Sequence, residues 1–220
     1  MIEISISPDT FNSFLRKFMF SKVDYLYQIH LILVESMGSY LPPVWRLFKG
    51  GKVLGYSVYS ADEIISNRCT NLNGVSIRTK DFVVTKQEIV FDAHAAPTGR
   101  TKFNGKQVER DVFLNHVDWC KVNNTIPLSR EDVYKNFIQK KFQGIIDVSN
   151  MQLTHYSLDK VSRRRHQEGV HIRKDLKSVT IPNVVISGSG SITNINALYD
   201  CLINGISRHT DFGFGTLLLR

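Results

Sequence analysis

The order of strand and helix patterns at the start of the chain most limits what it can fold into. Residues 1–7, MIEISIS, alternate apolar and polar side chains, which is typical of a strand with one buried face. Residues 21–37 then place apolar residues three and four positions apart, the spacing of one helix face, and Gly38 follows. These apolar positions are Leu26, Ile29, Leu33 and Met37. The chain therefore opens with a strand and a helix that can bury one face against each other.

A strand pair, a short helix and a further strand continue the pattern. Residues 44–48, VWRLF, and residues 53–60, VLGYSVYS, flank the glycine turn KGGK and predict a hairpin. Residues 61–69 predict a short helix, and residues 86–97 predict a strand that a proline ends. The order strand, helix, strand, strand, helix, strand is that of a ferredoxin-like unit, so we expect one over residues 1–97.

A second set of elements follows a polar segment. Residues 98–112, TGRTKFNGKQVERDV, are polar and basic, and we interpret them as a linking loop. Residues 113–124 and 129–142 predict two helices, and Ser129 with Asp132 makes a capping box for the second one.

The last third of the chain predicts a hairpin, a helix and a final strand. Residues 144–158 and 178–193 predict the two strands of the hairpin, whose tip carries charge. Residues 195–206 have helical apolar spacing, and residues 216–220, TLLLR, predict the closing strand.

Two half-chains of similar plan predict an α+β fold of tandem ferredoxin-like (RRM-like) domains. We expect residues 1–97 to form the N-terminal domain. Residues 98–220 are expected to hold the linking loop and the C-terminal domain. No sequence repeat is visible between the halves.

Positive charge is concentrated in one short segment. The chain has 28 Lys and Arg against 20 Asp and Glu, a formal net charge of +8 and a pI near 9.4. Residues 160–177, KVSRRRHQEGVHIRKDLK, hold seven Lys or Arg and two acids, so their net charge of +5 is most of the total. Such a segment favours a polyanionic partner such as nucleic acid; the alternative is a solvated surface loop.

Several classes of protein are excluded by what the sequence lacks. No apolar run approaches the ~20 residues of a membrane helix, and the acidic, alternating start is unlike a signal peptide, so we expect no membrane partner. Cys69, Cys120 and Cys201 form no CxxC pair, which predicts a reducing, cytoplasmic location. The histidines form no HExxH pattern, and SGSGS at residues 187–191 lacks the lysine of a phosphate loop. We therefore expect chemistry without a metal or cofactor.

Tyr27 and His30 lie three residues apart in the first predicted helix, so both side chains fall on one face. Histidine exchanges protons near neutral pH, and a tyrosine hydroxyl can orient, donate or accept a proton. The pair is therefore a candidate for proton transfer at a substrate. The alternative is that both rings only fill space. Tyr25 is a second candidate tyrosine, but its spacing of five places it on another face than His30.

The closing segment is rich in glycine. Residues 203–219, INGISRHTDFGFGTLLL, place Gly213 and Gly215 before the last strand, with Arg208 close by. Glycine lets the backbone approach a ligand, and the N–H groups of such a turn can hold phosphates.

These motifs, in this order and spacing, resemble the CasE-type CRISPR RNA-processing endoribonucleases, the Cascade subunit that cuts precursor CRISPR RNA. The resemblance covers nearly the whole chain. Besides the closing segment, it is carried by YQIH at 27–30, FDAHAAPTGRTKFNGK at 91–106, FLNHVDW at 113–119 and VVISGSGSITN at 184–194.

The resemblance implies two tandem ferredoxin-like domains and metal-independent cleavage of CRISPR repeat stem-loops. By position, His30 is then the catalytic histidine and Tyr27 its partner, with the roles of base and acid left open. The ribose 2′-hydroxyl upstream of the scissile phosphate would attack that phosphate, giving a 2′,3′-cyclic phosphate (or its opened form) and a 5′-hydroxyl. The enzyme would stay with the mature guide RNA among the other Cascade subunits, and would meet DNA only indirectly through that complex. The alternative is a non-catalytic RNA-hairpin-binding subunit of the same fold.

We expect RNA contacts at the charged hairpin, at the linking loop, at Lys22 at the start of the first predicted helix and at the glycine-rich closing segment. A-form RNA has a narrow major groove, so proteins recognise it by shape and phosphates. A cation near the scissile phosphate, such as Lys22, would stabilise its developing charge. The predicted RNA-binding residues are Lys22, Arg100, Lys102, Lys106, Lys160, Arg163, Arg164, Arg165, Arg173, Lys174, Arg208, Gly213 and Gly215.

Overall fold

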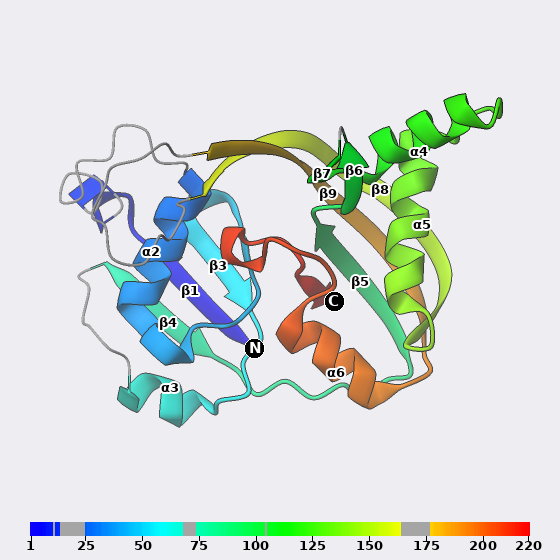
Figure 1. The fold of residues 1–220 in the computed structure, drawn as a ribbon. Coiled ribbons are helices and arrows are strands. Elements are labelled where there is room, and N and C mark those ends of the chain that lie inside the picture. Colours follow the sequence, from blue (N-terminus) through cyan, green and yellow to red (C-terminus); the bar gives the residue numbers. More distant parts are fainter. Residues whose placement is uncertain (11, 14–24, 68–73, 104, 164–176) are drawn as a thin grey trace.

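Two four-stranded antiparallel sheets lie side by side in the computed structural model, and a two-stranded sheet accompanies the second of them (Figure 1). The closing segment of the chain runs between the two halves, next to α2. The structure describes residues 1–10, 12–13, 25–67, 74–103, 105–163 and 177–220.

The first half is a ferredoxin-like unit. Its sheet has the order β2-β3-β1-β4 with antiparallel neighbours. The apolar faces of α2 and α3 bury Ile29, Leu33, Met37 and Ile64 against this sheet, which confirms the helical spacing seen in the sequence. The elements are β1 (Ile2–Ile6), α2 (Tyr25–Met37), η1 (Gly38–Tyr40), β2 (Trp45–Leu47), η2 (Lys49–Gly51), β3 (Lys52–Gly55), α3 (Ala61–Asn67) and β4 (Val75–Thr79).

The second half repeats the topology around a larger core. Its sheet has the order β10-β5-β9-β8, and aromatic and aliphatic side chains of α5 and α6 pack on it. The elements are β5 (Glu88–Ala95), β6 (Thr98–Phe103), β7 (Lys106–Asp111), α4 (Val112–Val122), α5 (Arg130–Phe142), β8 (Ile146–Arg163), β9 (Lys177–Ile192), α6 (Ile195–Asn204), η3 (Thr210–Phe212) and β10 (Leu217–Leu219). Both sheets thus have the strand order of a ferredoxin-like fold, and the predicted tandem arrangement is confirmed.

The helix starts follow their sequence signals. The Ser129 hydroxyl accepts a hydrogen bond from the Asp132 N–H at the start of α5, as the capping box predicts. The Asn194 side chain accepts from the Ala197 N–H at the start of α6. These caps satisfy backbone groups that the first turn of a helix leaves without a partner.

Two sequence predictions about the middle of the chain are wrong. The strand predicted at 86–97 does not complete the first unit, because β5 pairs with β9 and β10 in the second sheet. The first sheet is completed by β4 instead, a strand that we did not predict. Residues 98–112 are no linking loop, since β6 and β7 pair along their whole length. We therefore propose that the boundary between the halves lies at residues 80–87, before β5, instead of at residue 97.

The two halves meet along a junction of specific contacts. The Leu219 N–H of β10 donates to the Tyr56 hydroxyl of the first half at 3.2 Å, and the Val84 N–H donates to the Tyr199 hydroxyl at 3.0 Å. A Cβ on Gly213 would lie 2.7 Å from the Trp45 ring, so the closing segment sits directly against β2. The closing segment is therefore held by both halves.

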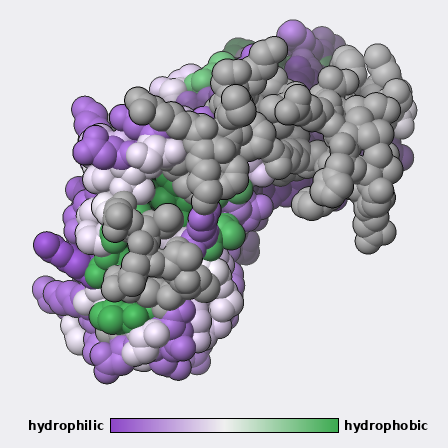
Figure 2. All heavy atoms as spheres, turned by 90° about the vertical axis from the view of Figure 1, so that its left-hand side faces the viewer, coloured by the Kyte–Doolittle hydropathy of each residue, from purple (hydrophilic) through white to green (hydrophobic). Residues whose placement is uncertain are grey.

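Among the residues that Figure 2 colours on the side of the first half, hydrophilic side chains predominate and apolar patches lie among them. None of the helices in the described part of the chain has both the length and the apolar character needed to cross a membrane.

Candidate active site

Helix α2 brings Tyr27 and His30 together, as their spacing predicts. The two ring centroids are 6.2 Å apart, and the ring planes are 30° from parallel. The opposite face of α2 is fixed in the core through Ile29 and Leu33, so the orientation of the helix is set by packing. Tyr25 is 48% exposed and lies outside this pair, which makes Tyr27 the tyrosine beside His30.

The pair lies where α2 and η3 meet the β8–β9 strand pair, close to the end of the strands at Arg163 and Lys177. The Tyr27 ring centroid is 6.3 Å from that of Phe212 in η3. Tyr27 also packs on a small buried cluster that includes Val161 of β8 and Ile181 of β9. Both Tyr27 and His30 remain half-buried, so the site is packed on one side and open on another.

Burial and a nearby carboxylate act in opposite directions on His30. Burial lowers the pKa of His30 below its ordinary value, and the negative charge of Asp211 in η3 partly offsets this by raising the pKa. The Nδ1 atom is buried without a hydrogen-bond partner among the described residues. A lowered pKa leaves the imidazole uncharged near neutral pH and able to accept a proton.

His94 has a structural role behind the closing segment. It is buried on β5, and its Nε2 lies 2.9 Å from the Asn183 Oδ1 atom. Burial, followed by the positive charge of Arg46, lowers the pKa of His94 to about 4. A histidine so placed stays neutral and fixed, which leaves His30 as the better candidate for proton exchange.

Glu109 of β7 holds the start of η3. Its Oε1 atom lies 2.9 Å from the His209 Nε2 atom and accepts a hydrogen bond from the Thr98 hydroxyl at 2.8 Å. The same oxygen is 3.7 Å from a guanidinium nitrogen of Arg208. His209 is buried, and its backbone φ of 66° is uncommon for a residue other than glycine. Glu109 thus fixes a bent segment that carries Phe212 to Tyr27.

Three residues at the site escaped the sequence analysis: Glu109, Asp211 and Phe212. Glu109 lies in a basic segment. The only sequence feature that pointed to it was a second acid, Asp111, two positions later. Asp211 and Phe212 lie between Arg208 and the glycines, but sequence alone does not show which helix a loop will touch.

Gly213 and Gly215 each have a structural reason to be glycine. Their φ values are 82° and 88°, in the left-handed region, and both are buried. A Cβ on Gly215 would lie 3.0 Å from the Ser207 carbonyl oxygen. The predicted contact of these glycines with RNA stays a prediction.

The structure describes part of the predicted RNA-binding set. Arg100 and Lys102 are exposed on β6 and share a face of the β6–β7 hairpin with Glu109, which lies opposite Arg100. The Arg208 side chain, which lies 3.7 Å from Glu109, is 47% exposed. Lys160 is exposed on β8, but it lies on the opposite strand face from its neighbour Val161, which packs near Tyr27.

The remaining predicted contacts fall at the edge of the described chain or outside it. Lys106 and Arg163 belong to β7 and β8, but their side chains are outside the description. Five further residues lie outside the described residues: Lys22, Arg164, Arg165, Arg173 and Lys174. The paired ends of β8 and β9, Arg163 opposite Lys177, confirm the predicted hairpin up to this point.

The residues that the structure describes include no group of three His, Cys, Asp or Glu side chains that could hold a metal ion. Tyr27 and His30 themselves carry groups that can transfer protons.

Fold and site together define a tandem ferredoxin-like protein with a Tyr-His pair at the junction of its halves. A family described as "CRISPR associated protein" matches residues 2–220, so the chain belongs to this CRISPR-associated family. No curated protein matches the chain in sequence. The resemblance that the sequence motifs carry is thus confirmed at the level of the family.

Solved structures share the fold over the whole chain. A CRISPR endoribonuclease Cse3 bound to 19 nt RNA is 15% identical with a TM-score of 0.62, and the match covers 100% of this chain and 98% of that one. The CRISPR-associated protein Cas6e from Escherichia coli K-12 is 18% identical with a TM-score of 0.53, at 100% and 98% coverage. A chain of a CRISPR RNA-guided surveillance complex is 16% identical with a TM-score of 0.57, at 99% and 98% coverage. At such identities the likeness establishes a common fold.

Proposed function

We propose that this chain is a metal-independent endoribonuclease that binds CRISPR repeat stem-loops and cleaves precursor CRISPR RNA. It then stays with the mature guide RNA among the other Cascade subunits. The observation that carries the proposal is the half-buried Tyr27–His30 pair, with an uncharged imidazole, at the junction of the two halves. The likeness to an RNA-bound CRISPR endoribonuclease and to a surveillance-complex chain supports it.

The proposed reaction needs one proton removed and one supplied. The ribose 2′-hydroxyl attacks the adjacent phosphate, the bond to the leaving 5′ oxygen breaks, and a 2′,3′-cyclic phosphate and a 5′-hydroxyl result. We assign removal of the 2′-hydroxyl proton to His30, because a lowered pKa keeps its imidazole in the accepting form. Nδ1 is buried, so exchange with the substrate falls to Nε2. Tyr27 orients the phosphate or protonates the leaving oxygen.

The cationic side chains supply binding and charge stabilisation. Arg100, Lys102 and Arg208 are exposed beside the segment that contacts Tyr27, and phosphate contacts from such residues set affinity without reading sequence. The β8–β9 hairpin supports this arrangement, since the ends of its strands that lead into the basic segment at 164–176 pack on Tyr27.

The decisive experiment incubates the purified protein with a repeat hairpin RNA in the presence of EDTA. We expect the wild type to cut, His30→Ala to bind without cutting, and His155→Ala, which alters an exposed histidine on β8, to cut normally. A 2′-deoxy substitution upstream of the cut should abolish cleavage, because it removes the attacking hydroxyl. Loss of cleavage in EDTA that added Mg²⁺ restores would contradict metal independence.

The second candidate is a non-catalytic subunit that binds the same hairpin. The packing of Tyr27 on Phe212 and Val161 favours it, since a tyrosine in such contacts can serve packing alone. Tight hairpin binding by the wild type without any cleavage product would select this alternative.

A further inference from the structure

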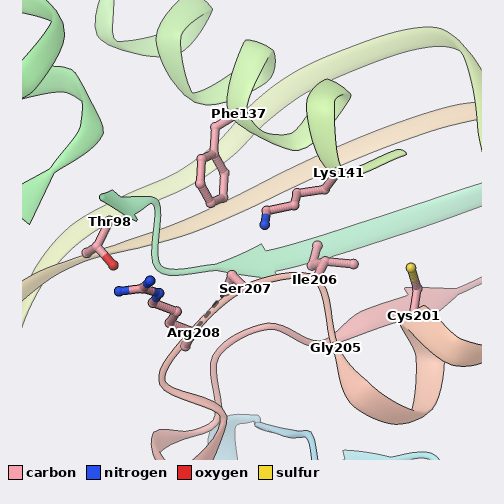
Figure 3. Close-up of a pocket in the computed structure, with 8 residues that line it drawn as sticks. All are labelled: Thr98, Phe137, Lys141, Cys201, Gly205, Ile206, Ser207 and Arg208. Carbon is pink, nitrogen blue, oxygen red and sulfur yellow. Dashed lines mark hydrogen bonds between the residues drawn. The ribbon is translucent and has the colours of Figure 1, made fainter. Parts of the chain in front are cut away.

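A pocket of about 420 Å³ opens between α5, the end of α6 and the segment that follows α6 (Figure 3). It lies outside the Tyr27–His30 site. Figure 3 shows Phe137 and Lys141 reaching into it from α5 and Arg208 reaching toward it from the opposite side. Its lining residues are Thr98, Phe137, Lys141, Cys201, Gly205, Ile206, Ser207 and Arg208.

The lining combines two cations with an aromatic ring. The Lys141 Nζ atom is 5.6 Å from the centroid of the Phe137 ring, on the same helix. Arg208 adds a second positive charge, and the described residues that line the pocket include no Asp or Glu. Two acids lie close to lining residues: Glu109 is 3.7 Å from Arg208, and Asp200 precedes Cys201 in α6. A cation beside an aromatic face is the usual platform for a nucleotide, because the ring stacks on the base and the cation holds the phosphate.

The polar groups of the pocket indicate where the phosphate and the base of a nucleotide would each bind. The Thr98 hydroxyl donates to Glu109, and the Ser207 hydroxyl accepts from the Ala96 N–H, so neither is a main determinant. Helix α6 ends at Asn204, next to Gly205 of the pocket, and the last carbonyl groups of a helix disfavour an anion. The phosphate therefore belongs at Lys141 and Arg208, and the base belongs against Phe137.

The pocket is close in the chain to both parts of the candidate site. Arg208 lies four residues before Phe212, which contacts Tyr27. Thr98 begins β6, whose exposed Arg100 and Lys102 continue the line of positive charge. The closing segment thus contributes residues both to the pocket and to the surroundings of Tyr27.

We infer that this pocket binds one unpaired nucleotide next to the RNA stem, with its base on Phe137 and its phosphate between Lys141 and Arg208. The inference rests on the proposed function, because it takes the RNA hairpin as the ligand. It adds a subsite for single-stranded RNA that the Tyr27–His30 pair does not need for the chemical step.

Two neighbouring lysines make a sharp test. Lys141 lines this pocket, whereas Lys140, the preceding residue of α5, lines a different hollow beside β8. Hairpin RNA with and without single-stranded extensions on either side serves as the probe, and fluorescence anisotropy at one fixed salt concentration measures affinity. We expect the wild type to bind extended RNA more tightly than the bare hairpin. Lys141→Ala should weaken the binding of extended RNA about tenfold, and Lys140→Ala should leave the affinity for extended RNA unchanged.

Phe137→Leu separates stacking from folding, because leucine keeps the apolar contact of a half-buried residue and removes the ring. It should weaken binding of extended RNA and leave the bare hairpin unaffected. Equal weakening by Lys141→Ala and Lys140→Ala, or a wild type indifferent to extensions, would overturn the inference. The proposed function fails separately, since its failure is the absence of cleavage of the bare hairpin by the wild type.

Discussion

At the scale of single residues, the chemistry depends on how the folded chain sets the charge of His30. Burial disfavours the charged imidazole, and the Asp211 carboxylate favours it. The first effect is the larger one, so the pKa of His30 lies below its ordinary value. Because Asp211 is exposed, its charge can be removed with little change in packing.

Removal of the Asp211 charge should move the pH dependence of cleavage. In Asp211→Asn the pKa of His30 falls further, because only burial remains. The proton-accepting form then persists to lower pH, so the acid limb of kcat/KM should shift to lower pH. A pH profile of hairpin cleavage under limiting substrate measures this shift, since kcat/KM reports ionisation of the free enzyme.

Asp62→Asn is the matched control, because Asp62 is an exposed acid in the first turn of α3 and its substitution changes net charge equally. It should leave the acid limb in place. A limb that moves upward in Asp211→Asn, or moves equally in both variants, would contradict the assignment of His30 as the base.

The spacing of Tyr27 and His30 made this pair predictable, because helix geometry places i and i+3 on one face whatever the helix packs against. Asp211 and Phe212 were not predictable in the same way. Asp211 lies 181 residues after His30 and Phe212 lies 185 residues after Tyr27, so only the tertiary fold decides these contacts.

At the scale of elements, the β6–β7 hairpin is the unit that connects the cations proposed to bind RNA with the closing segment. Arg100 lies opposite Glu109 in the register, and Glu109 contacts His209. The polar sequence of this hairpin explains why residues 98–112 are predicted to be a loop. Its strands pair with each other and with no larger sheet, so they have little reason to alternate apolar and polar side chains.

Loss of the Glu109 carboxylate should reduce cleavage more than binding. Glu109→Ala leaves the buried His209 ring and the Thr98 hydroxyl without the acceptor that they share, which costs about 1–3 kcal/mol of stability for a buried polar group. The segment that carries Phe212 to Tyr27 then loses its fixed position. We expect a cleavage rate at least about tenfold lower in single-turnover assays, at saturating enzyme, with hairpin affinity largely kept.

Glu109→Gln should restore much of the rate, because its amide oxygen still accepts hydrogen bonds. Glu131→Ala controls for net charge, since Glu131 pairs with Lys135 on α5, away from the closing segment. If Glu109→Ala cleaves at the wild-type rate, or loses binding and cleavage together, the hairpin does not position the pair.

At the scale of the whole molecule, the sequence predicts which helices and strands form better than it predicts which strands pair with each other. The alternation in β1, the helical spacing in α2 and the capping residues of α5 are local signals, and each element formed where they lie. Which sheet a strand joins is decided by distant residues, so β5 was assigned to the wrong half and β4 was missed.

The junction between the halves depends on glycines in the closing segment, and a pair of substitutions tests this. Gly213 and Gly50 both have positive φ, 82° and 76°, so alanine at either position carries a backbone cost of about 1–2 kcal/mol. A Cβ at Gly50 meets nothing within 4 Å, whereas one at Gly213 lies 2.7 Å from the Trp45 ring. Gly213→Ala should therefore lose about 1–3 kcal/mol more in urea unfolding than Gly50→Ala.

The comparison also bears on catalysis, because Gly213 ends η3 and Trp45 belongs to the first half. A displaced η3 moves Phe212 away from Tyr27, so cleavage by Gly213→Ala should fall below that of Gly50→Ala when both are assayed well below their unfolding temperatures. If the two variants have equal free energies of unfolding, the Trp45 ring moves aside without an energetic cost. The closing segment would then be positioned by its other contacts, such as that of His209 with Glu109, rather than by the packing of Gly213 on Trp45.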